Sequence, residues 1–178
     1  MPALHELPYQ DDDGTLRAVV EVPKGSRVKT KWEPELGAMV VGRPLPAGLA
    51  YPFDWGFIPG TIAEDGDPLD ALILCEDASS WPGVVVPVRA VGLLRIDQKG
   101  TKGRQRNDRL VTIPTGLSRW GRIRSVADLS KQMRDEVEKF FLDSTFFTDK
   151  DARSRGFAGP AVARRTVERA ARAFRDKQ

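Results

Sequence analysis

Short strand-like runs separated by proline and glycine constrain the fold of this chain more than any other feature. Runs that are rich in β-branched residues and end at turn residues are typical of β-strands. Such runs lie at residues 16–22, 28–32, 38–41, 71–75, 84–96 and 109–113. After the third run, GRPLPAGLAYPFDWGFIPGT contains too much proline and glycine for a helix or a long strand. Its alternating aromatics, Tyr51, Phe53, Trp55 and Phe57, are predicted to pack in the core.

Two helical patterns follow the strands. Ser125 with Asp128 resembles a helix start. The apolar residues Leu129, Met133, Val137, Phe140 and Phe141 then recur at helical spacing. Pro160 opens a second pattern, in which Val162, Val167, Ala170, Ala171 and Phe174 form a narrow apolar stripe.

Strands first and helices last predict a mostly antiparallel barrel or a strongly curved sheet with helices packed beside it. The 178 residues suit one domain, residues 1–178, and we expect the acidic, turn-rich segment 1–14 to be loose.

Composition excludes several classes of protein. One histidine and one cysteine cannot form an intrachain disulfide or a usual zinc site, so any metal should be bound by oxygen. Cys75 lies in the apolar run ALILC and is predicted to be buried. We find no run of about 18 apolar residues and no secretory signal, so we expect a cytoplasmic protein without a membrane partner. The net charge is +3, and the basic stretch from Lys150 onward fits either solubility or nucleic-acid binding.

The most unusual stretch is EDGDPLD at residues 64–70, which places four carboxylates within seven positions. Like charges this close repel, and this cost needs an offsetting interaction. Pro68 disfavours a helix at Asp67, so residues 65–70 are predicted to form a turn that leads into the strand ALILC. Aspartates that converge without histidine or cysteine suit hard divalent cations such as Mg²⁺ or Ca²⁺, although a solvated loop is the plain alternative.

Further charged residues lie near other predicted turns. They are Glu21, Glu33 and Asp97 among the carboxylates and Lys31 and Arg43 among the cations. Carboxylates hold metal ions, whereas lysine and arginine hold phosphate oxygens. The combination therefore suits a phosphate bridged by metal ions.

These motifs resemble the soluble family I inorganic pyrophosphatases. EDGDPLD matches that family's signature, and VEVPKGS, KWE, GR, AYPFDWGFIPGT, RAVGLLRID and a helix that ends in KFF resemble the family in the expected order. The resemblance implies an α+β, mainly β fold, a small five-stranded, OB-like closed barrel flanked by two C-terminal helices. It also implies Mg²⁺-dependent hydrolysis of inorganic pyrophosphate to two phosphates, in a homo-oligomer that is commonly a hexamer in bacteria.

The resemblance also implies roles for single residues. Asp67 would be the general base, and Asp65, Asp70 and Asp97 would bind metal. Glu21 and Glu33 would support metal-bound waters. Lys31 and Arg43 would hold the leaving phosphate, supported by Tyr51, and Trp55 and Arg109 stand where the family has a substrate-binding tyrosine and lysine.

Three departures affect the half of the family's site that holds the phosphate under attack. Trp55 replaces a tyrosine, and its ring nitrogen only donates. Asn107 stands where the family has an aspartate; Asp108 is an alternative, but a shift by one residue along a strand would turn it to the other face. Ser144 and Thr145 replace a Tyr-Lys pair.

Replacement cations are a hypothesis with two sources. The insertion KGTKGRQR carries Lys99, Lys102, Arg104 and Arg106, and its alternative interpretation is a solvated loop. Lys150 or Arg153 is a second source.

We therefore predict a divergent Mg²⁺-dependent pyrophosphatase. The first alternative is a family member with another phosphoanhydride substrate or much reduced activity. The second is a nucleic-acid-binding barrel, which would need exposed aromatics among the basic residues. We expect no nucleic-acid partner, because the carboxylates of the acidic turn would repel its backbone.

Overall fold

The computed structural model describes residues 3–75, 79–101, 103–116 and 120–177. In chain order its elements are η1 (Leu4–Glu6), β1 (Leu16–Val22), β2 (Val28–Glu33), β3 (Ala38–Pro44), β4 (Asp54–Ile58), β5 (Leu69–Ile73), β6 (Val85–Gly100), β7 (Gly103–Arg106), β8 (Arg109–Pro114), η3 (Val126–Asp128), α1 (Lys131–Ser144), β9 (Arg153–Ala158) and α2 (Pro160–Arg175).

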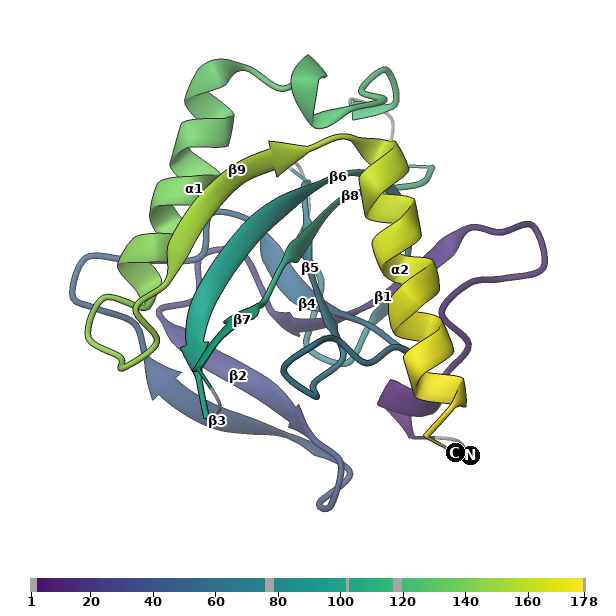
Figure 1. Ribbon diagram of the computed structural model, residues 1–178, viewed down its shortest axis with the longest axis horizontal. Helices are drawn as coiled ribbons and strands as arrows, with labels where there is room; N and C mark the ends of the chain where they lie inside the picture. Colours follow the sequence, from purple (N-terminus) through teal and green to yellow (C-terminus); the bar gives the residue numbers. More distant parts are fainter. Residues whose placement is uncertain (1–2, 76–78, 102, 117–119, 178) are drawn as a thin grey trace.

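Five strands close into a ring. The pairs run β1–β4, β4–β5, β5–β8, β8–β6 and β6–β1, and β5–β8 is the parallel pair among them. The long strand β6 continues beyond the ring and also pairs with β7 and β9. The hairpin of β2 and β3 forms a separate sheet beside the barrel, and β9 arches between α1 and α2 (Figure 1). The prediction of a mainly β, five-stranded barrel with two helices is confirmed.

Two apolar clusters fill the structure. One lies beneath α1 and contains the aromatics Tyr51, Trp55, Phe140 and Phe141. The other lies beneath α2, whose small residues Ala163, Val167 and Ala170 pack on strands of the ring. All four alternating aromatics and Cys75 are buried, as predicted.

Several element boundaries differ from the prediction. The charged run after Ile96 is not a loop, because Asp97–Gly100 pairs with Gly103–Arg106 as a β-hairpin. The short strand β4 and the strand β9 were not predicted. Ser125 caps only the 3₁₀ helix η3, whereas Ser130 caps α1 by accepting a hydrogen bond from Met133 N at 3.1 Å.

The acidic turn also ends earlier than predicted. β5 begins at Leu69, so Asp70 is a strand residue opposite Phe57 of β4. The ladder hydrogen bonds of β5 therefore fix the position of Asp70, whereas Asp65 and Asp67 lie on the preceding turn.

The N-terminal segment makes defined contacts with the strands. The carbonyl of His5 accepts a hydrogen bond from Gly60 N at 2.8 Å, and its Nδ1 accepts one from Trp32 Nε1 at 3.0 Å. η1 and the end of α2 lie close together and line the same cavity (Figure 1). None of the described helices has the length and apolarity that a membrane crossing requires.

Gly56 allows β4 to lie tightly on β1. A Cβ at this position would lie 1.8 Å from the carbonyl oxygen of Val19. Since this atom belongs to a paired backbone, it cannot move without opening the β1–β4 ladder.

We expect Gly56→Ala to lower the free energy of unfolding by about 3 kcal/mol or more. Urea unfolding followed by tryptophan fluorescence measures this change. Gly159→Ala is the matched control, because its φ is −77° and no atom lies within 4 Å of the added Cβ. Equal stability of the two variants would contradict the close approach.

Candidate active site

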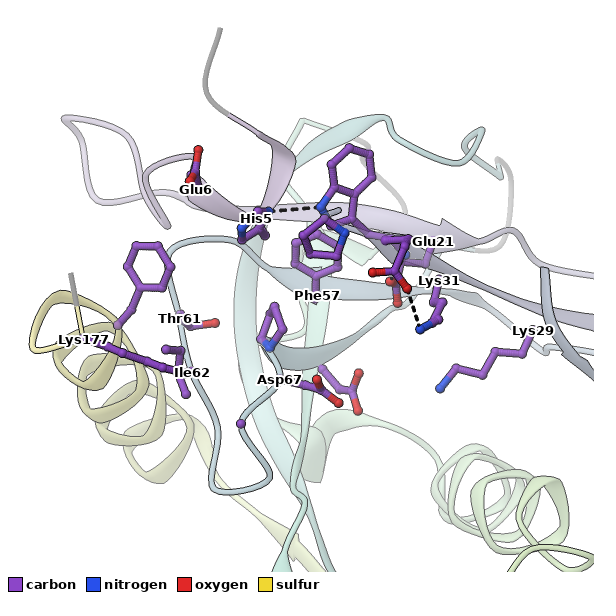
Figure 2. Close-up of a pocket in the computed structure, with 17 residues that line it drawn as sticks. His5, Glu6, Glu21, Lys29, Lys31, Phe57, Thr61, Ile62, Asp67 and Lys177 are labelled. Atoms are coloured by element: carbon purple, nitrogen blue, oxygen red, sulfur yellow. Dashed lines mark hydrogen bonds and ion pairs between the residues drawn. The ribbon is translucent and has the colours of Figure 1, made fainter. Parts of the chain in front are cut away.

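A cavity of about 530 Å³ lies between the β2–β3 hairpin, the acidic turn and the end of α2. Its charged lining is Glu6, Glu21, Lys29, Lys31, Glu33, Asp67, Asp70 and Lys177. Figure 2 shows Glu21, Lys31 and Lys29 on one side and Thr61, Ile62 and Lys177 on the other. Five of the predicted site residues therefore line one cavity: Glu21, Lys31, Glu33, Asp67 and Asp70.

The aspartates of the acidic turn lie close enough to affect one another. Asp67 N donates to Asp65 Oδ1 at 3.3 Å, and Ala63 N donates to the Asp67 carbonyl at 2.8 Å, so the turn is folded on itself. The pKa of Asp65 is raised, first by burial and then by the negative charges of Asp70 and Asp67. These three carboxylates therefore carry the mutual repulsion that the sequence predicts.

Glu21 brings a fourth carboxylate to the same place. It lies at a β-bulge in β1, is 8% exposed, and accepts a hydrogen bond from Trp32 N at 2.7 Å. Burial, with smaller contributions from Asp70 and Asp67, raises its pKa to about 7. Within the described residues, no three His, Cys, Asp or Glu side chains stand close enough together to hold a metal ion.

Lysines of β2 face these carboxylates. Lys31 pairs with Glu33 at 3.0 Å, and both line the cavity with Lys29. Lys29 is a cavity residue that the sequence analysis missed. The two-residue period of β2 was the available signal, because it places residues 29, 31 and 33 on one face.

Arg43 and Tyr51 connect this region to α1. Arg43 Nη2 donates to the carbonyl of Ser144 at 2.7 Å. The Tyr51 ring lies 5.0 Å from Phe140, and its pKa is raised by burial. The charges of Arg43, Asp70, Glu21 and Arg109 also act on this phenol, so it lies beneath the charged cluster.

Arg109 is buried beneath α1. It forms an ion pair with Asp70 at 2.6 Å, hydrogen-bonds to Asn107 Oδ1, and lies 5.5 Å from the Trp55 ring and 4.6 Å from the Phe141 ring. Its side chain is 5% exposed. In the described structure Arg109 therefore neutralises Asp70. The sequence analysis expected Arg109 to contact the substrate at this position.

Asp97 does not line the cavity. Its carboxylate pairs with Arg155 at 2.7 Å and with Arg106 at 3.6 Å, and the Arg155 hydrogen bond is the main cause of its lowered pKa. The next residue, Gln98, is 3% exposed and lies on the same strand face as the buried Ile96. Strand alternation thus directs residue 98 inward and residue 97 outward, in contrast to the expected metal-binding position of Asp97.

Asp108 also faces away from the cavity. Its Oδ1 accepts hydrogen bonds from Ile96 N at 3.0 Å and from Arg106 at 2.9 Å, and it lines a different cavity with Arg169. Asn107 is the residue on the side of Arg109 and Asp70. Asn107 and Asp108 thus face opposite sides, as expected for two residues that are neighbours along the chain.

The end of α1 offers no outward hydroxyl. Ser144 Oγ donates to the carbonyl of Phe141 at 2.8 Å, and Thr145 Oγ1 donates to that of Leu142 at 3.0 Å. Both side chains are therefore engaged with their own helix.

A closed barrel with clustered carboxylates opposite lysines carries the groups that a metal-assisted hydrolase of phosphate compounds needs. The fold and the cavity together point to this class of protein.

The chain belongs to the inorganic pyrophosphatase family. The family model described as "Inorganic pyrophosphatase" matches residues 18–175. The inorganic pyrophosphatase of Thermus thermophilus is 40% identical over 143 residues, which cover 79% of this chain and 78% of the relative. That of Synechocystis is 32% identical over 138 residues, which cover 78% and 79%.

Solved structures agree with this family. A crystal structure of inorganic pyrophosphatase from Thermus thermophilus matches with a TM-score of 0.89 and 33% identity, over 98% of this chain and 99% of that chain. The enzyme from Helicobacter pylori matches with a TM-score of 0.85 and 31% identity, over 95% and 98%.

The raised pKa of Glu21 predicts a specific effect of pH on stability. In metal-free protein, the unfolded chain loses this proton near pH 4.5, whereas the folded protein keeps it to about pH 7. Glu21 therefore lowers the free energy of unfolding as the pH rises through this window. We expect Glu21→Gln to be more stable than wild type at pH 8, by about 1–3 kcal/mol, and not at pH 4.

Urea unfolding in excess chelator at the two pH values measures this difference. Glu35→Gln serves as the control, because Glu35 is exposed. A Glu21→Gln effect that is the same at both pH values would contradict a raised pKa.

Proposed function

We propose that this protein hydrolyses inorganic pyrophosphate to two phosphates with Mg²⁺ as cofactor. The observation that carries the proposal is the single cavity in which Glu21, Asp67 and Asp70 face Lys29 and Lys31, in a chain of the pyrophosphatase family. The lysines are suited to the phosphate oxygens, and the carboxylates to a divalent cation.

The carboxylates fit a hard divalent cation. Mg²⁺ prefers oxygen ligands. Burial is the main cause of the raised pKa values of Asp65 and Glu21, and the negative charges of Asp70 and Asp67 add to it, so a cation bound here would offset this repulsion. We propose Asp65 and Asp70 as metal ligands, with Glu21 nearby. Glu33 and Asp97 are paired with Lys31 and Arg155 and fit this group less well.

The other residues then have distinct tasks. Bound Mg²⁺ would neutralise phosphate charge and make water easier to deprotonate. Asp67, which is exposed to the cavity, would accept the proton of the attacking water. As the new P–O bond forms and the bridging P–O bond breaks, Lys31, Lys29 and Arg43 would hold the departing phosphate. Tyr51, which is buried near Arg43, would help to hold Arg43 in position.

A second candidate function is hydrolysis of another phosphoanhydride. It is favoured by the changed half of the site: Trp55 is buried without an acceptor for Nε1 among the described residues, Arg109 pairs with Asp70, and Ser144 and Thr145 bond to their own helix.

The nucleic-acid-binding alternative loses its support. Two aromatics of the C-terminal third, Phe146 and Phe147, are exposed, as single-strand binding would need. The cavity, however, is lined by carboxylates, and family membership favours a hydrolase.

We also propose the cellular setting from the family and composition. The protein would act in the cytoplasm as a single-domain homo-oligomer, such as a hexamer. A single, free and buried cysteine suits a reducing compartment. Exposed Phe146 and Phe147 provide apolar surface that subunit contacts would cover.

Phosphate release tests the substrate. We expect purified protein to release phosphate from pyrophosphate with Mg²⁺, to lose this activity in excess chelator, and to act at least tenfold more slowly on ATP and tripolyphosphate. A faster rate with either rival would establish the second candidate function.

Asp67→Asn tests the proton acceptor. We expect kcat to fall about 10²–10⁴-fold, because the amide cannot accept the proton at neutral pH, while the thermal unfolding temperature stays within a few degrees of wild type. Asp12→Asn, on an exposed loop, is the control. A kcat within threefold of wild type would remove Asp67 from this role.

A further inference from the structure

The cavity beside the acidic turn has a second end, away from its phosphate-binding lysines. Figure 2 shows Thr61, Ile62 and Lys177 at this end, whereas Lys29 and Lys31 lie at the other. The volume of about 530 Å³ lies in the range that encloses a drug-sized ligand, and a diphosphate ion is much smaller. The cavity therefore has room for a group beside the phosphates.

The second end carries apolar side chains that do not belong to the core. Trp32, Ile62 and Phe174 are half-buried and line the cavity. Trp32 contacts His5 of η1, and the carbonyl of Phe174 accepts a hydrogen bond from Lys177 N at 3.2 Å. Among the described residues, the two apolar clusters of the protein include none of these three side chains. Core packing thus does not explain them, and their apolar surface is available to a ligand.

Hydrogen bonds between distant segments hold the walls of this end. The carbonyl of His5 accepts a hydrogen bond from Gly60 N at 2.8 Å, and Ile62 N donates to the carbonyl of Ala170 at 2.9 Å. These bonds join η1, the loop after β4 and α2. The second end is therefore a formed pocket, with walls that stay in place when a ligand enters.

His5 gives this pocket a polar donor. Its Nδ1 accepts a hydrogen bond from Trp32 Nε1 at 3.0 Å, and an indole nitrogen only donates. Nδ1 therefore carries no proton, so the proton of the neutral ring is on Nε2, which is a donor. Lys177 adds a cation to the lining. Both groups suit the acceptor atoms of a heteroaromatic ring.

We propose that the second end of the cavity binds the base of a nucleoside diphosphate whose phosphates occupy the charged end. This inference rests on the proposed function, because the charged end must accept a diphosphate. The base would lie against Phe174 and Trp32, since every base has a face that stacks on aromatic rings. Such a ligand takes the place of pyrophosphate and competes with it. The inference concerns affinity, whereas the phosphate-release experiment with ATP compares rates.

Calorimetric titration with α,β-methylene-ADP, whose phosphorus atoms are joined by a bridge that resists hydrolysis, tests the inference without turnover. Methylenediphosphonate supplies the same bridge without the nucleoside. In Mg²⁺, we expect wild type to bind the nucleotide at least tenfold more tightly than the diphosphonate, because stacking adds affinity. The nucleotide should also raise the KM for pyrophosphate without changing kcat.

Variants of Phe174 locate the base. Phe174→Ala should weaken nucleotide binding about 5–100-fold, the usual loss when one stacking ring is removed. Binding of the diphosphonate should change far less, so the ratio of the two Kd values is the readout. Phe174→Tyr keeps the ring and should retain most of the affinity. Trp81→Ala is the matched control, because Trp81 is 79% exposed and is not part of the cavity lining, and it should bind both ligands within twofold of wild type.

The outcomes separate this inference from the proposed function. If wild type binds both ligands equally while it hydrolyses pyrophosphate, the pocket for the base is disproved and the proposed function stands. An equal loss of nucleotide binding in Phe174→Ala and Trp81→Ala would also overturn the inference, because a general change of the surface would explain it. If wild type binds neither ligand and releases no phosphate from pyrophosphate, the proposed function fails as well.

Discussion

The buried ion pair between Arg109 and Asp70 is the interaction on which the site and the barrel both depend. It joins β8 to β5, the parallel pair of the ring, and Arg109 packs against the rings of both Trp55 and Phe141. A buried ion pair adds little net stability, but the loss of one partner leaves an uncompensated charge at a high cost. Asp70 also lines the cavity, so the same carboxylate belongs to the core and to the chemistry.

Electrostatic repulsion explains much of the cavity's design. Burial, together with neighbouring negative charges, raises the pKa of Glu21 on β1 and of Asp65 on the acidic turn. Lysines of β2 line the cavity with Glu21, Asp67 and Asp70. Neither set is neutralised within itself. A divalent cation would neutralise the carboxylates, and a phosphate would neutralise the lysines. A metal-bound diphosphate carries both charges and is therefore a suitable ligand.

The departures from the family pattern have a consistent structural meaning. Trp55 and Arg109 pack together beneath α1, and the hydroxyls of Ser144 and Thr145 donate hydrogen bonds to carbonyls at the end of that helix. These positions have become part of the core and of a helix end. Arg104 of the basic β6–β7 hairpin holds the connection between α1 and β9 through its hydrogen bonds to Asp151.

The sequence by itself determined the class of fold and the chemistry of the site. Runs rich in β-branched residues, followed by helical spacing, predicted the barrel and helices, and the acidic turn with its following strand indicated a metal and phosphate site, because these signals are local. Only the tertiary structure decided which charges meet. Pairing across strands turned a predicted loop into the β6–β7 hairpin, and Lys102, one of its predicted cations, lies outside the described residues. Pairing likewise directed Asp97 outward and Gln98 inward, and it joined Arg109 to Asp70. The Arg109–Asp70 pair joins two strands that are far apart in the sequence, and such a contact follows from how the ring closes, which spacing along one strand cannot specify.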